Sequence, residues 1–333
     1  MVTIREIAKK AGVSVGTVSK VLNYDKTVSE INKKKVIRII KELNYRPNRI
    51  ARSLSKGKTK NVGFIIPDIT NPFFPELVRG ASDLLISNGY YVFLCSSDND
   101  ANKEDFYIND LVSMWIDGMI IAPSDTENRD IGIFNKIISP FVVVDREIKE
   151  LNKDLIIINN KKGAYEAVNY LISNGHRKIV ILAGLQYTKT AQNRFRGWKK
   201  ALEEKDLFQE EFVFWGSFSI DSGYEMMKKV FDNLGKVEAV FACNDLIALG
   251  AIQAIEEKSY KIPDDISIVG FDDIYLSKFL KPPLTTVRQP IYDMGKIAAE
   301  ILLDRMSSSV DFVPKKVVIE GNLIVRSSVA RKT

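Results

Sequence analysis

The chain has 333 residues, of which 45% are hydrophobic, and it carries a formal net charge of +6. This length allows two or three domains with hydrophobic cores of their own. No apolar run reaches about 18 residues, and the amphipathic start MVTIREIAKK lacks the apolar segment of a signal peptide, so we expect a cytoplasmic protein without membrane contact.

Positive charge is concentrated at the amino end of the chain. Residues 1–60 contain 16 Lys and Arg against 4 Asp and Glu, a local net charge of +12, whereas the remainder carries −6. This distribution indicates that only the first segment meets a polyanion. Composition alone fits a solvated lysine-rich helix equally well, so the pattern of residues has to decide.

Three short helices are predicted in this basic segment. Thr3 and Glu6 have the spacing of a capping box, and Gly12 sits where a left-handed residue would end the first helix. Ser14 and Ser29 are suited to cap the second and third helices. The apolar faces predicted for the three helices are Ile4, Ile7, Ala8 and Ala11; Val15, Val18, Val21 and Leu22; and Ile31, Val36, Ile39, Ile40 and Leu43.

Two helices joined by a tight glycine-containing turn form a helix-turn-helix, whose second helix enters the major groove of DNA. In GVSVGTVSKVLN the polar side of that helix carries short side chains, which let the backbone approach DNA closely. Ser14, Thr17 and Ser19 suit phosphate contacts. Lys20 has the reach for a guanine edge. We therefore predict an all-α DNA-binding domain over residues 1–46.

The stretches TIREIAKKAGVSVGTVSKVLN and YRPNRIARSL closely resemble the amino-terminal signature of the LacI/GalR family of bacterial transcription regulators, and the resemblance extends through the whole chain. It implies a hinge at residues 47–58 that becomes helical on operator DNA, where Leu54 wedges into a minor-groove step and kinks the duplex. Gly16 and Ser55 depart from the family pattern, so the operator sequence does not transfer from relatives. The predicted DNA-contacting residues are Ser14, Val15, Gly16, Thr17, Ser19, Lys20, Asn23, Tyr45, Asn48, Ala51 and Leu54.

After Lys60 the sequence changes to short apolar runs separated by amphipathic stretches of helix length, which is typical of parallel sheets covered by helices on both faces. The runs are 61–66, 91–95, 117–121, 141–145, 155–158, 178–182, 239–243 and 266–270. Two such units in tandem form a hinged binding protein, with the ligand at the carboxyl ends of the strands.

The family resemblance implies crossovers between the two units near residues 160, 288 and 320. The effector-binding and dimerisation domain then covers residues 59–333 and divides into an N-subdomain (59–160 plus 289–320) and a C-subdomain (161–288 plus 321–333). The predicted fold class is α+β multidomain. It comprises a small all-α helix-turn-helix head and hinge helix, followed by two α/β parallel-sheet subdomains of periplasmic-binding-protein type.

Catalysis is not expected. The single histidine, His176, is interpreted as a structural turn residue before a strand. The sequence has no nucleophile elbow, phosphate loop or His/Cys cluster, so neither a cofactor nor a metal is predicted. Asp272 and Asp273 are adjacent on a strand end and are expected to point apart. Cys95 and Cys243 lie far apart within apolar runs and are predicted to be small buried hydrophobes without a disulfide.

Polar and aromatic residues follow the predicted strands at their carboxyl ends. Each one alone also fits a helix cap, a core residue or a surface ion pair. Together they resemble the pocket of ribose-type periplasmic binding proteins, where carboxylates, guanidinium groups and amides grip neighbouring sugar hydroxyls and aromatic rings cover the C–H faces. The predicted effector-binding residues are Asn71, Phe73, Phe74, Asp145, Arg146, Arg194, Phe218, Asn244, Asp272 and Gln289.

The resulting hypothesis is a homodimeric repressor of sugar-utilisation genes that binds pseudo-palindromic double-stranded operator DNA. Its effector is expected to be a small sugar, with ribose favoured and arabinose-, fructose- or galactose-like sugars open. One alternative is a catabolite-control regulator with a phosphorylated carrier protein as corepressor, although Glu300 stands where that group has an arginine for the phosphoserine. The other is a sugar-binding transport component, which would need a signal peptide and no DNA-binding head.

Overall fold

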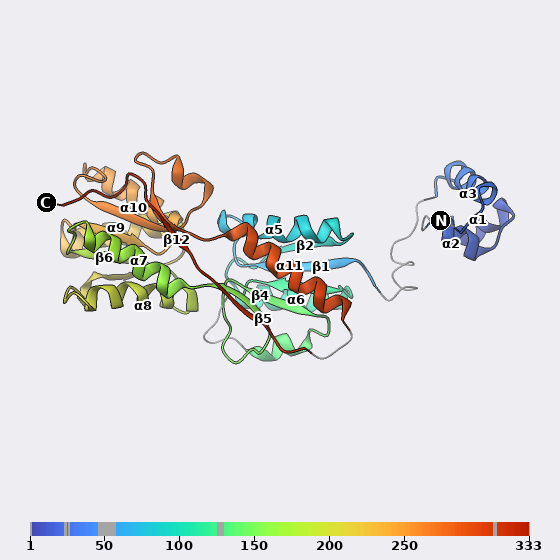
Figure 1. The fold of residues 1–333 in the computed structure, drawn as a ribbon, viewed down its shortest axis with the longest axis horizontal. Coiled ribbons are helices and arrows are strands. Elements are labelled where there is room, and N and C mark those ends of the chain that lie inside the picture. The colour runs from blue at the N-terminus through green and yellow to red at the C-terminus, as the bar shows by residue number, and fades with distance from the viewer. Residues whose placement is uncertain are drawn as a thin grey trace. The chain divides into compact units, whose positions relative to one another are not determined.

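The structure is a computed structural model that describes residues 2–22, 25, 27–45, 58–124, 130–308 and 312–332. The chain packs as two compact units, one before Lys60 and one from Lys60 onward (Figure 1). The first is a helical head and the second contains two α/β subdomains, which confirms the predicted fold class. Four predicted DNA contacts, Asn23, Asn48, Ala51 and Leu54, lie outside the described residues, as do residues 47–57 of the predicted hinge.

The head consists of three helices: α1 (Ile4–Ala11), α2 (Val15–Leu22) and α3 (Glu30–Glu42). The capping box is confirmed, because the N–H of Glu6 donates to Thr3 Oγ1 (3.3 Å) and the N–H of Thr3 donates to Glu6 Oε2 (3.1 Å). Gly12 ends α1 with a left-handed φ of 65°. The hydroxyls of Ser14 and Ser29 cap α2 and α3 as predicted.

The three helices enclose a small core of their own, which consists of Ile7, Ala8, Ala11, Val18, Val21, Val36 and Ile39. The prediction that Val15 and Ile31 belong to this core is wrong, since they are 42% and 70% exposed. Both lie in the first turn of a helix, whereas the core residues lie deeper in α2 and α3. Helical periodicity gives the direction of a side chain but not the point at which the neighbouring helices end.

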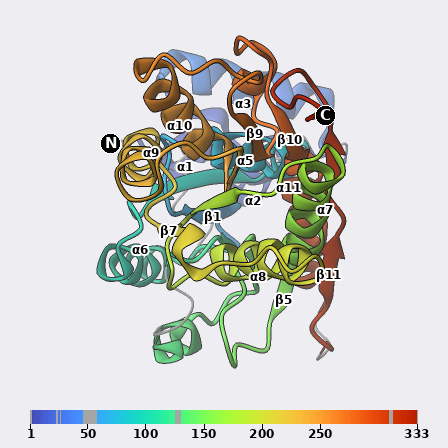
Figure 2. The ribbon, with the colours of Figure 1, turned by 90° about the vertical axis from the view of Figure 1, so that its left-hand side faces the viewer.

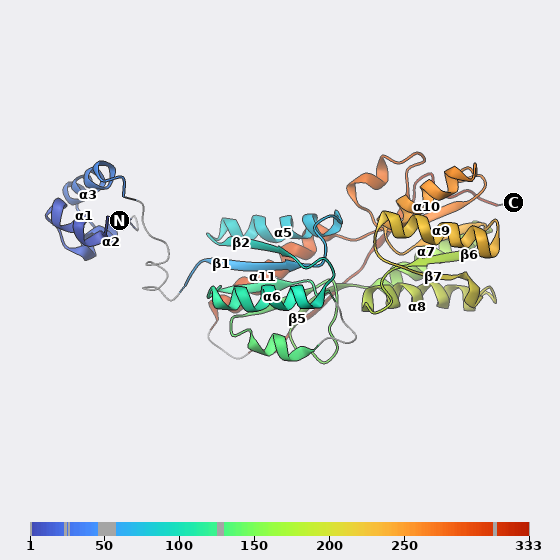
Figure 3. The same ribbon diagram turned by 180° about the vertical axis from the view of Figure 1, so that it is seen from behind.

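The N-subdomain is built on a six-stranded parallel sheet in the order β11-β5-β4-β3-β1-β2. The strands are β1 (Asn61–Ile66), β2 (Tyr91–Ser96), β3 (Gly118–Ile121), β4 (Phe141–Val144), β5 (Asp154–Ile158) and β11 (Lys316–Ile319). Helices α5 (Phe73–Ser87) and α11 (Ile291–Ser307) pack together on one face, as Figure 1 shows. The other face is covered by α6 (Ala101–Ser113), seen in Figure 3, and by the 3-10 turn η1 (Ile131–Lys136).

The C-subdomain repeats this arrangement with the sheet order β12-β10-β9-β8-β6-β7. Its strands are β6 (Ile179–Ala183), β7 (Val213–Trp215), β8 (Ala239–Ala242), β9 (Ser267–Asp272), β10 (Thr285–Arg288) and the antiparallel β12 (Asn322–Ile324). Its elements outside the sheet are α7 (Asn160–Ser173), α8 (Lys189–Glu203), η2 (Glu210–Phe212), α9 (Ile220–Leu234), α10 (Asp245–Glu257) and η3 (Tyr275–Lys278). Helices α9 and α10 pack together on one face of the sheet and α7 and α8 on the other, as Figure 2 shows end-on.

The chain passes between the two subdomains three times. It crosses after β5, between β10 and α11, and between β11 and β12. In each sheet the first strand of the repeat lies between the second and the third, so strand order reverses at β1 and at β6. The loops that follow these two strands are the topological switch points at which open α/β sheets bind ligands.

All eight apolar runs predicted as strands are strands, with ends that differ by at most two residues. The short strands β7, β10, β11 and β12 had no such run, because β10 begins with two threonines and β7, β11 and β12 are edge strands of three or four residues. Cys243 is buried as predicted. Cys95 is only partly buried, because β2 is also an edge strand.

Two kinds of feature are absent from the described ranges. None of their helices is both long and apolar enough to cross a membrane. Within the same ranges no group of three or more His, Cys, Asp or Glu side chains is arranged to hold a metal ion. His176 is fully buried, and its Nε2 lies 3.0 Å from the carbonyl oxygen of Ala330, which is consistent with a structural role.

Candidate functional site

The first candidate site is the outer surface of α2 in the head. Val18 and Val21 point into the core, which leaves Ser14, Val15, Gly16 and Lys20 exposed and Thr17 and Ser19 partly exposed on the opposite side. The Ser14 hydroxyl caps α2 and lies 2.9 Å from the Thr17 hydroxyl. This surface combines short side chains with one cation, as a helix that lies in a major groove requires.

Tyr45 takes a different position from the other predicted DNA contacts. It follows α3 and packs, partly buried, against the core of the head. The structure therefore brings six of the eleven predicted contacts together on α2, places Tyr45 apart from them, and leaves four outside the described residues.

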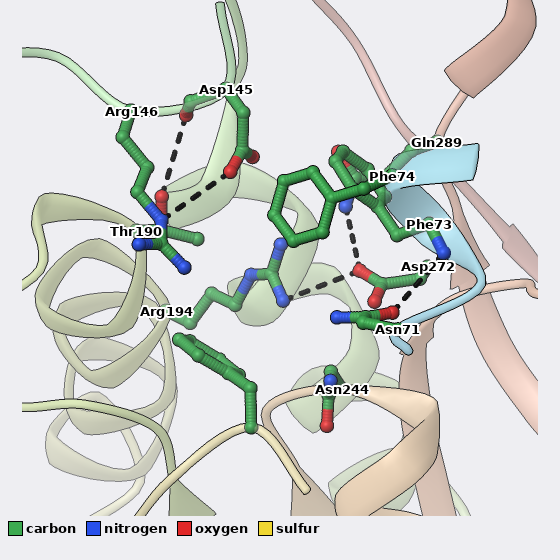
Figure 4. Close-up of a pocket in the computed structure, with 11 residues that line it drawn as sticks. Asn71, Phe73, Phe74, Asp145, Arg146, Thr190, Arg194, Asn244, Asp272 and Gln289 are labelled. Carbon is green, nitrogen blue, oxygen red and sulfur yellow. Dashed lines mark hydrogen bonds and ion pairs between the residues drawn. The ribbon is translucent and has the colours of Figure 1, made fainter. Parts of the chain in front are cut away.

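The second candidate site is a pocket between the two subdomains. It is partly open to solvent and is drawn in Figure 4. All ten residues predicted for the effector site line it, together with Thr190. The residues come from the carboxyl ends of strands in both sheets and from the helices that begin there.

On the N-subdomain side, Asp145 and Arg146 follow β4 and are both buried. Arg146 Nε lies 3.5 Å from Asp145 Oδ2, and Arg146 Nη1 donates to the carbonyl oxygens of Pro123 (3.1 Å) and Ser124 (2.9 Å). The guanidinium group is thereby fixed in orientation. The possibility that these two residues form a surface ion pair is wrong, because their side chains are only 6% and 3% exposed.

On the C-subdomain side, Arg194 of α8 and Asp272 at the end of β9 form the matching pair. Arg194 Nη1 lies 3.4 Å from Asp272 Oδ1, its Nε donates to Asn160 Oδ1 (2.7 Å), and it also donates to the carbonyl oxygen of Cys243. Gln289 Nε2 donates to Asp272 Oδ1 (2.6 Å). Asp273, next along the chain, has separate partners, as the sequence predicted.

Burial dominates the protonation of both pocket carboxyls. It raises the pKa of Asp272 to about 8, although the Arg194 guanidinium opposes this shift. Burial also raises the pKa of Asp145, against the effects of Arg146 and Arg194. Burial removes water from both carboxyls, and the neighbouring groups of the protein compensate for that loss only in part. A ligand that donates hydrogen bonds to either carboxyl would therefore stabilise it.

Aromatic rings form the walls of the pocket. Phe73 and Phe74 open α5 and contact each other edge to face at 5.0 Å between ring centroids. They belong to the N-subdomain core as well as to the pocket, so the core interpretation and the pocket interpretation both hold. Phe218 faces from the C-subdomain, and its ring can lie there because residue 184 is glycine, where a Cβ would come within 2.2 Å of it.

Three buried polar atoms of the pocket have no hydrogen-bond partner in the protein. They are Arg146 Nε, Asn244 Nδ2 and Gln289 Oε1. Asn244 Oδ1 caps α10 by accepting from the N–H of Ile247 (2.8 Å), so Asn244 is a helix cap whose amide nitrogen remains available. A buried polar group without a partner costs about 1–3 kcal/mol, and three in one cavity indicate a site built for a polar ligand.

Sequence reasoning missed two residues here. Thr190 lines the pocket and donates through Oγ1 to the carbonyl oxygen of Asp145 (3.4 Å), across the two subdomains. It precedes Arg194 by four residues on α8, so helical periodicity would have placed it on the same face. Asn160, the first residue of α7, orients Arg194 from behind, and no motif in the sequence marked it.

Comparison with known proteins identifies the family of the chain. The family model of bacterial regulatory proteins of the lacI family matches residues 3–48, and a periplasmic binding protein-like domain matches residues 168–329. The chain is also 36% identical over 99% of both chains to the HTH-type transcriptional repressor PurR of Mannheimia succiniciproducens. The chain belongs to the LacI family. It is a DNA-binding transcriptional repressor with a small-molecule effector site.

Solved structures of LacI-family proteins have the same fold. The lac repressor dimer bound to operator and the anti-inducer ONPF is 26% identical, with a TM-score of 0.88 over 99% of both chains. A LacI-family regulator from Enterococcus faecium with bound ribose is 30% identical, with a TM-score of 0.73 over 82% of this chain and 100% of that one. Neither matching family model describes an enzyme.

Proposed function

We propose that this LacI-family repressor is controlled by a small neutral monosaccharide, ribose or a near relative, bound in the pocket between its subdomains. The observation that carries the proposal is the set of three buried polar atoms around the cavity that have no hydrogen-bond partner in the protein. Arg146 Nε and Asn244 Nδ2 are donors, whereas Gln289 Oε1 is an acceptor. A hydroxyl both donates and accepts, so a ring with several hydroxyls can satisfy all three atoms at once.

The charges of the pocket favour a neutral ligand. The two carboxyls and the two guanidinium groups already face one another as Asp145 with Arg146 and Asp272 with Arg194. A phosphorylated sugar would bring a dianion close to both carboxyls, and the guanidinium groups of Arg146 and Arg194 already donate hydrogen bonds to the protein. Free sugars are therefore favoured over sugar phosphates. The ribose bound to the Enterococcus faecium relative supports the same class of ligand.

A purine base is the second candidate. The PurR relative matches nearly the whole chain, and the aromatic rings of Phe73, Phe74 and Phe218 that line the pocket suit a flat heterocycle. The sugar remains the preferred ligand, because Asp145 and Arg146 are adjacent, buried and suited to two neighbouring hydroxyls. Control by a phosphorylated carrier protein is less favoured, since Glu300 is half exposed on α11, where it lies 3.9 Å from Lys296 Nζ, and its carboxylate would repel a phosphoserine.

In the proposed mechanism a homodimer places two α2 helices in successive major grooves of a pseudo-palindromic operator. The sugar contacts residues of both subdomains and therefore favours one relative orientation of the two. Because the hinge residues 47–58 precede β1 of the N-subdomain, that orientation sets the spacing of the two hinges in the dimer. Coupling of this kind amounts to about 1–3 kcal/mol between the two binding sites.

The proposal is tested with thermal unfolding in millimolar ribose, other pentoses, hexoses, ribose 5-phosphate and purine bases. A ligand at ~100 times its Kd stabilises the native state by about 2.7 kcal/mol. The stabilising compound is then added to the protein bound to an operator selected from random duplex DNA, and binding is followed by fluorescence anisotropy. A response to one free monosaccharide in both assays supports the proposal. A response confined to a purine base or to the sugar phosphate would replace the ligand and leave the repressor unchanged.

A further inference from the structure

A second ionic cluster lies next to the pocket residue Asp272, around the buried carboxylate of Asp273. The carboxylate of Asp273 accepts from Arg288 Nε (2.6 Å) through Oδ2 and from Arg326 Nη2 (2.6 Å) through Oδ1. The Asp273 side chain is 5% exposed and that of Arg326 is 16% exposed. None of these three residues lines the pocket.

The cluster holds the backbone of a residue that does line the pocket. Asp272 has φ 115° and Asp273 has φ 56°, two successive positive values that side chains other than glycine rarely adopt. Such strain persists only where the surroundings impose it. Here the Asp273 carboxylate is tied on both sides, and the N–H of Gln289 donates to the carbonyl oxygen of Asp272 (3.2 Å). The direction of the Asp272 carboxyl therefore depends on the partners of Asp273.

Both arginines lie close in the sequence to crossovers between the subdomains. Arg288 is the last residue of β10 and pairs with Asp272 in the sheet, and the chain crosses to α11 directly afterwards. Arg326 follows β12, which begins as soon as the chain has crossed back from β11. Arg326 also donates to the carbonyl oxygen of Leu284 (2.7 Å), which fixes its head group.

The charge of Asp273 also acts on a residue of the other subdomain. Glu76 lies in the first turn of α5 in the N-subdomain, and its pKa is raised by burial and by the negative charge of Asp273, against the effect of Arg79. The charge of Asp273 thus acts on one residue of the helix that carries Phe73 and Phe74 into the pocket.

We propose that Asp273 is a positioning residue that, through Arg288 and Arg326, couples the orientation of Asp272 in the pocket to two of the three crossovers. The inference rests on the proposed function of the pocket. In this proposal, a cluster that contacts neither the ligand nor DNA transmits the effect of ligand binding to the DNA-binding site. Removal of the Asp273 charge then disconnects the two sites, so the ligand binds less tightly and its effect on DNA binding is lost.

The test compares Asp273→Asn with Asp154→Asn in the full chain. Asp154 is a matched control, because it is fully buried and accepts both Arg305 Nε and Nη2 (2.9 Å each), but it lies at the first residue of β5, at the opposite end of the strand from the pocket. For each protein we would measure ribose affinity by calorimetry and operator affinity with and without saturating ribose. The ratio of the two operator affinities is the coupling factor, for which 5- to 150-fold is usual.

We expect Asp273→Asn to weaken ribose binding by about tenfold and to bring the coupling factor within about twofold of one, whereas Asp154→Asn lowers the unfolding temperature and leaves the coupling factor unchanged. Equal coupling factors in Asp273→Asn and wild type would overturn the inference. If Asp273→Asn does not fold, Arg288→Met, at a side chain that is 53% exposed, replaces it and should still reduce the coupling factor severalfold. An unchanged factor in that variant overturns the inference equally.

The wild-type measurement separates the two proposals. If ribose changes the operator affinity of wild type and of the Asp273 variant equally, the proposed function stands and the inference about Asp273 is wrong. Wild type that responds only to a purine base corrects the ligand, and the same comparison is then made with that base. Wild type that responds to neither ribose nor a purine base removes both proposals.

Discussion

We predict that the Asp272 carboxyl, which lines the pocket, reduces the stability of the folded protein. Burial raises its pKa to about 8, whereas in the unfolded chain the carboxyl titrates near its ordinary value of 3.8. At pH 7 the Asp272 carboxyl is therefore mostly protonated in the folded state and ionised in the unfolded state. At 1.36 kcal/mol per pKa unit, the difference between pH 3.8 and pH 7 amounts to about 4 kcal/mol in favour of unfolding.

The substitution Asp272→Asn removes this ionisation and retains an oxygen that can accept from Gln289. We expect the free energy of unfolding to increase by about 2–4 kcal/mol at pH 7. The lower value allows for the cost of burying the amide. For a unit of this size the unfolding temperature would rise by roughly 5–15 °C. Because the folded pKa is raised, the cost is absent below the ordinary pKa and grows as pH rises toward 8. The difference in the free energy of unfolding between variant and wild type should therefore decrease by about 3 kcal/mol from pH 7.5 to pH 5.

Thermal unfolding of both proteins between pH 5 and pH 7.5, with and without ribose, checks this expectation. Asp265→Asn is the control of opposite sign, since the hydrogen bond from Lys236 lowers the pKa of Asp265, and its loss should reduce stability near neutral pH. Asp272→Asn should also lose the stabilisation by ribose. A variant that unfolds at or below the wild-type temperature at pH 7.5, or a gap that does not change with pH, would refute the reasoning.

Four further changes have defined outcomes. Gly16→Ala meets only the Ser14 hydroxyl at 3.6 Å, so it should stabilise the head by about 1 kcal/mol in thermal unfolding, and an unchanged operator affinity would contradict a close backbone approach to DNA. Gly295→Ala places a Cβ 1.9 Å from the carbonyl oxygen of Leu77 and should cost about 3 kcal/mol or more by separating α5 from α11; a loss below 1 kcal/mol in urea unfolding would show that the helices adjust. Burial lowers the pKa of His176, so stability should fall as pH drops below about 6.5, and His176→Gln should abolish that part of the pH profile; an identical profile would exclude the histidine as its source. Leu54→Ala should weaken operator binding at least tenfold, about 1.4 kcal/mol, and leave ribose affinity intact; equal operator affinity would rule out the wedge.

The sequence predicts the pocket well because its residues follow recognisable strands. Asn71, Asp145 and Asn244 come soon after buried apolar runs, and the carboxyl ends of parallel strands meet at one edge of a sheet. Their shared location is thus a consequence of topology. The protonation of Asp272 was not predictable in the same way, because it depends on burial and on the distances to Arg194 and to the Asp245 carboxyl.

Other features were missed because they depend on where neighbouring elements end. Val15 and Ile31 match the apolar periodicity of their helices but lie in first turns, away from the core. The Asp273 cluster joins residues from β10 and from the segment after β12, which are far apart in the sequence and carry no motif. Local patterns determine elements, whereas contacts between distant segments require the fold.

The three crossings between the subdomains also determine the order in which the two subdomains can finish folding during synthesis. The sheet of the N-subdomain has five strands by Ile158, but its face remains open until α11 arrives about 130 residues later, after nearly all of the C-subdomain has been made. At ribosomal speeds of about 5–20 residues per second this interval lasts roughly ten seconds. Phe73, Leu77 and the rest of the apolar surface under α11 are exposed during that time. A nascent chain stalled before Ile291 should therefore carry a DNA-binding head with its own core and an unfinished partner that chaperones recognise.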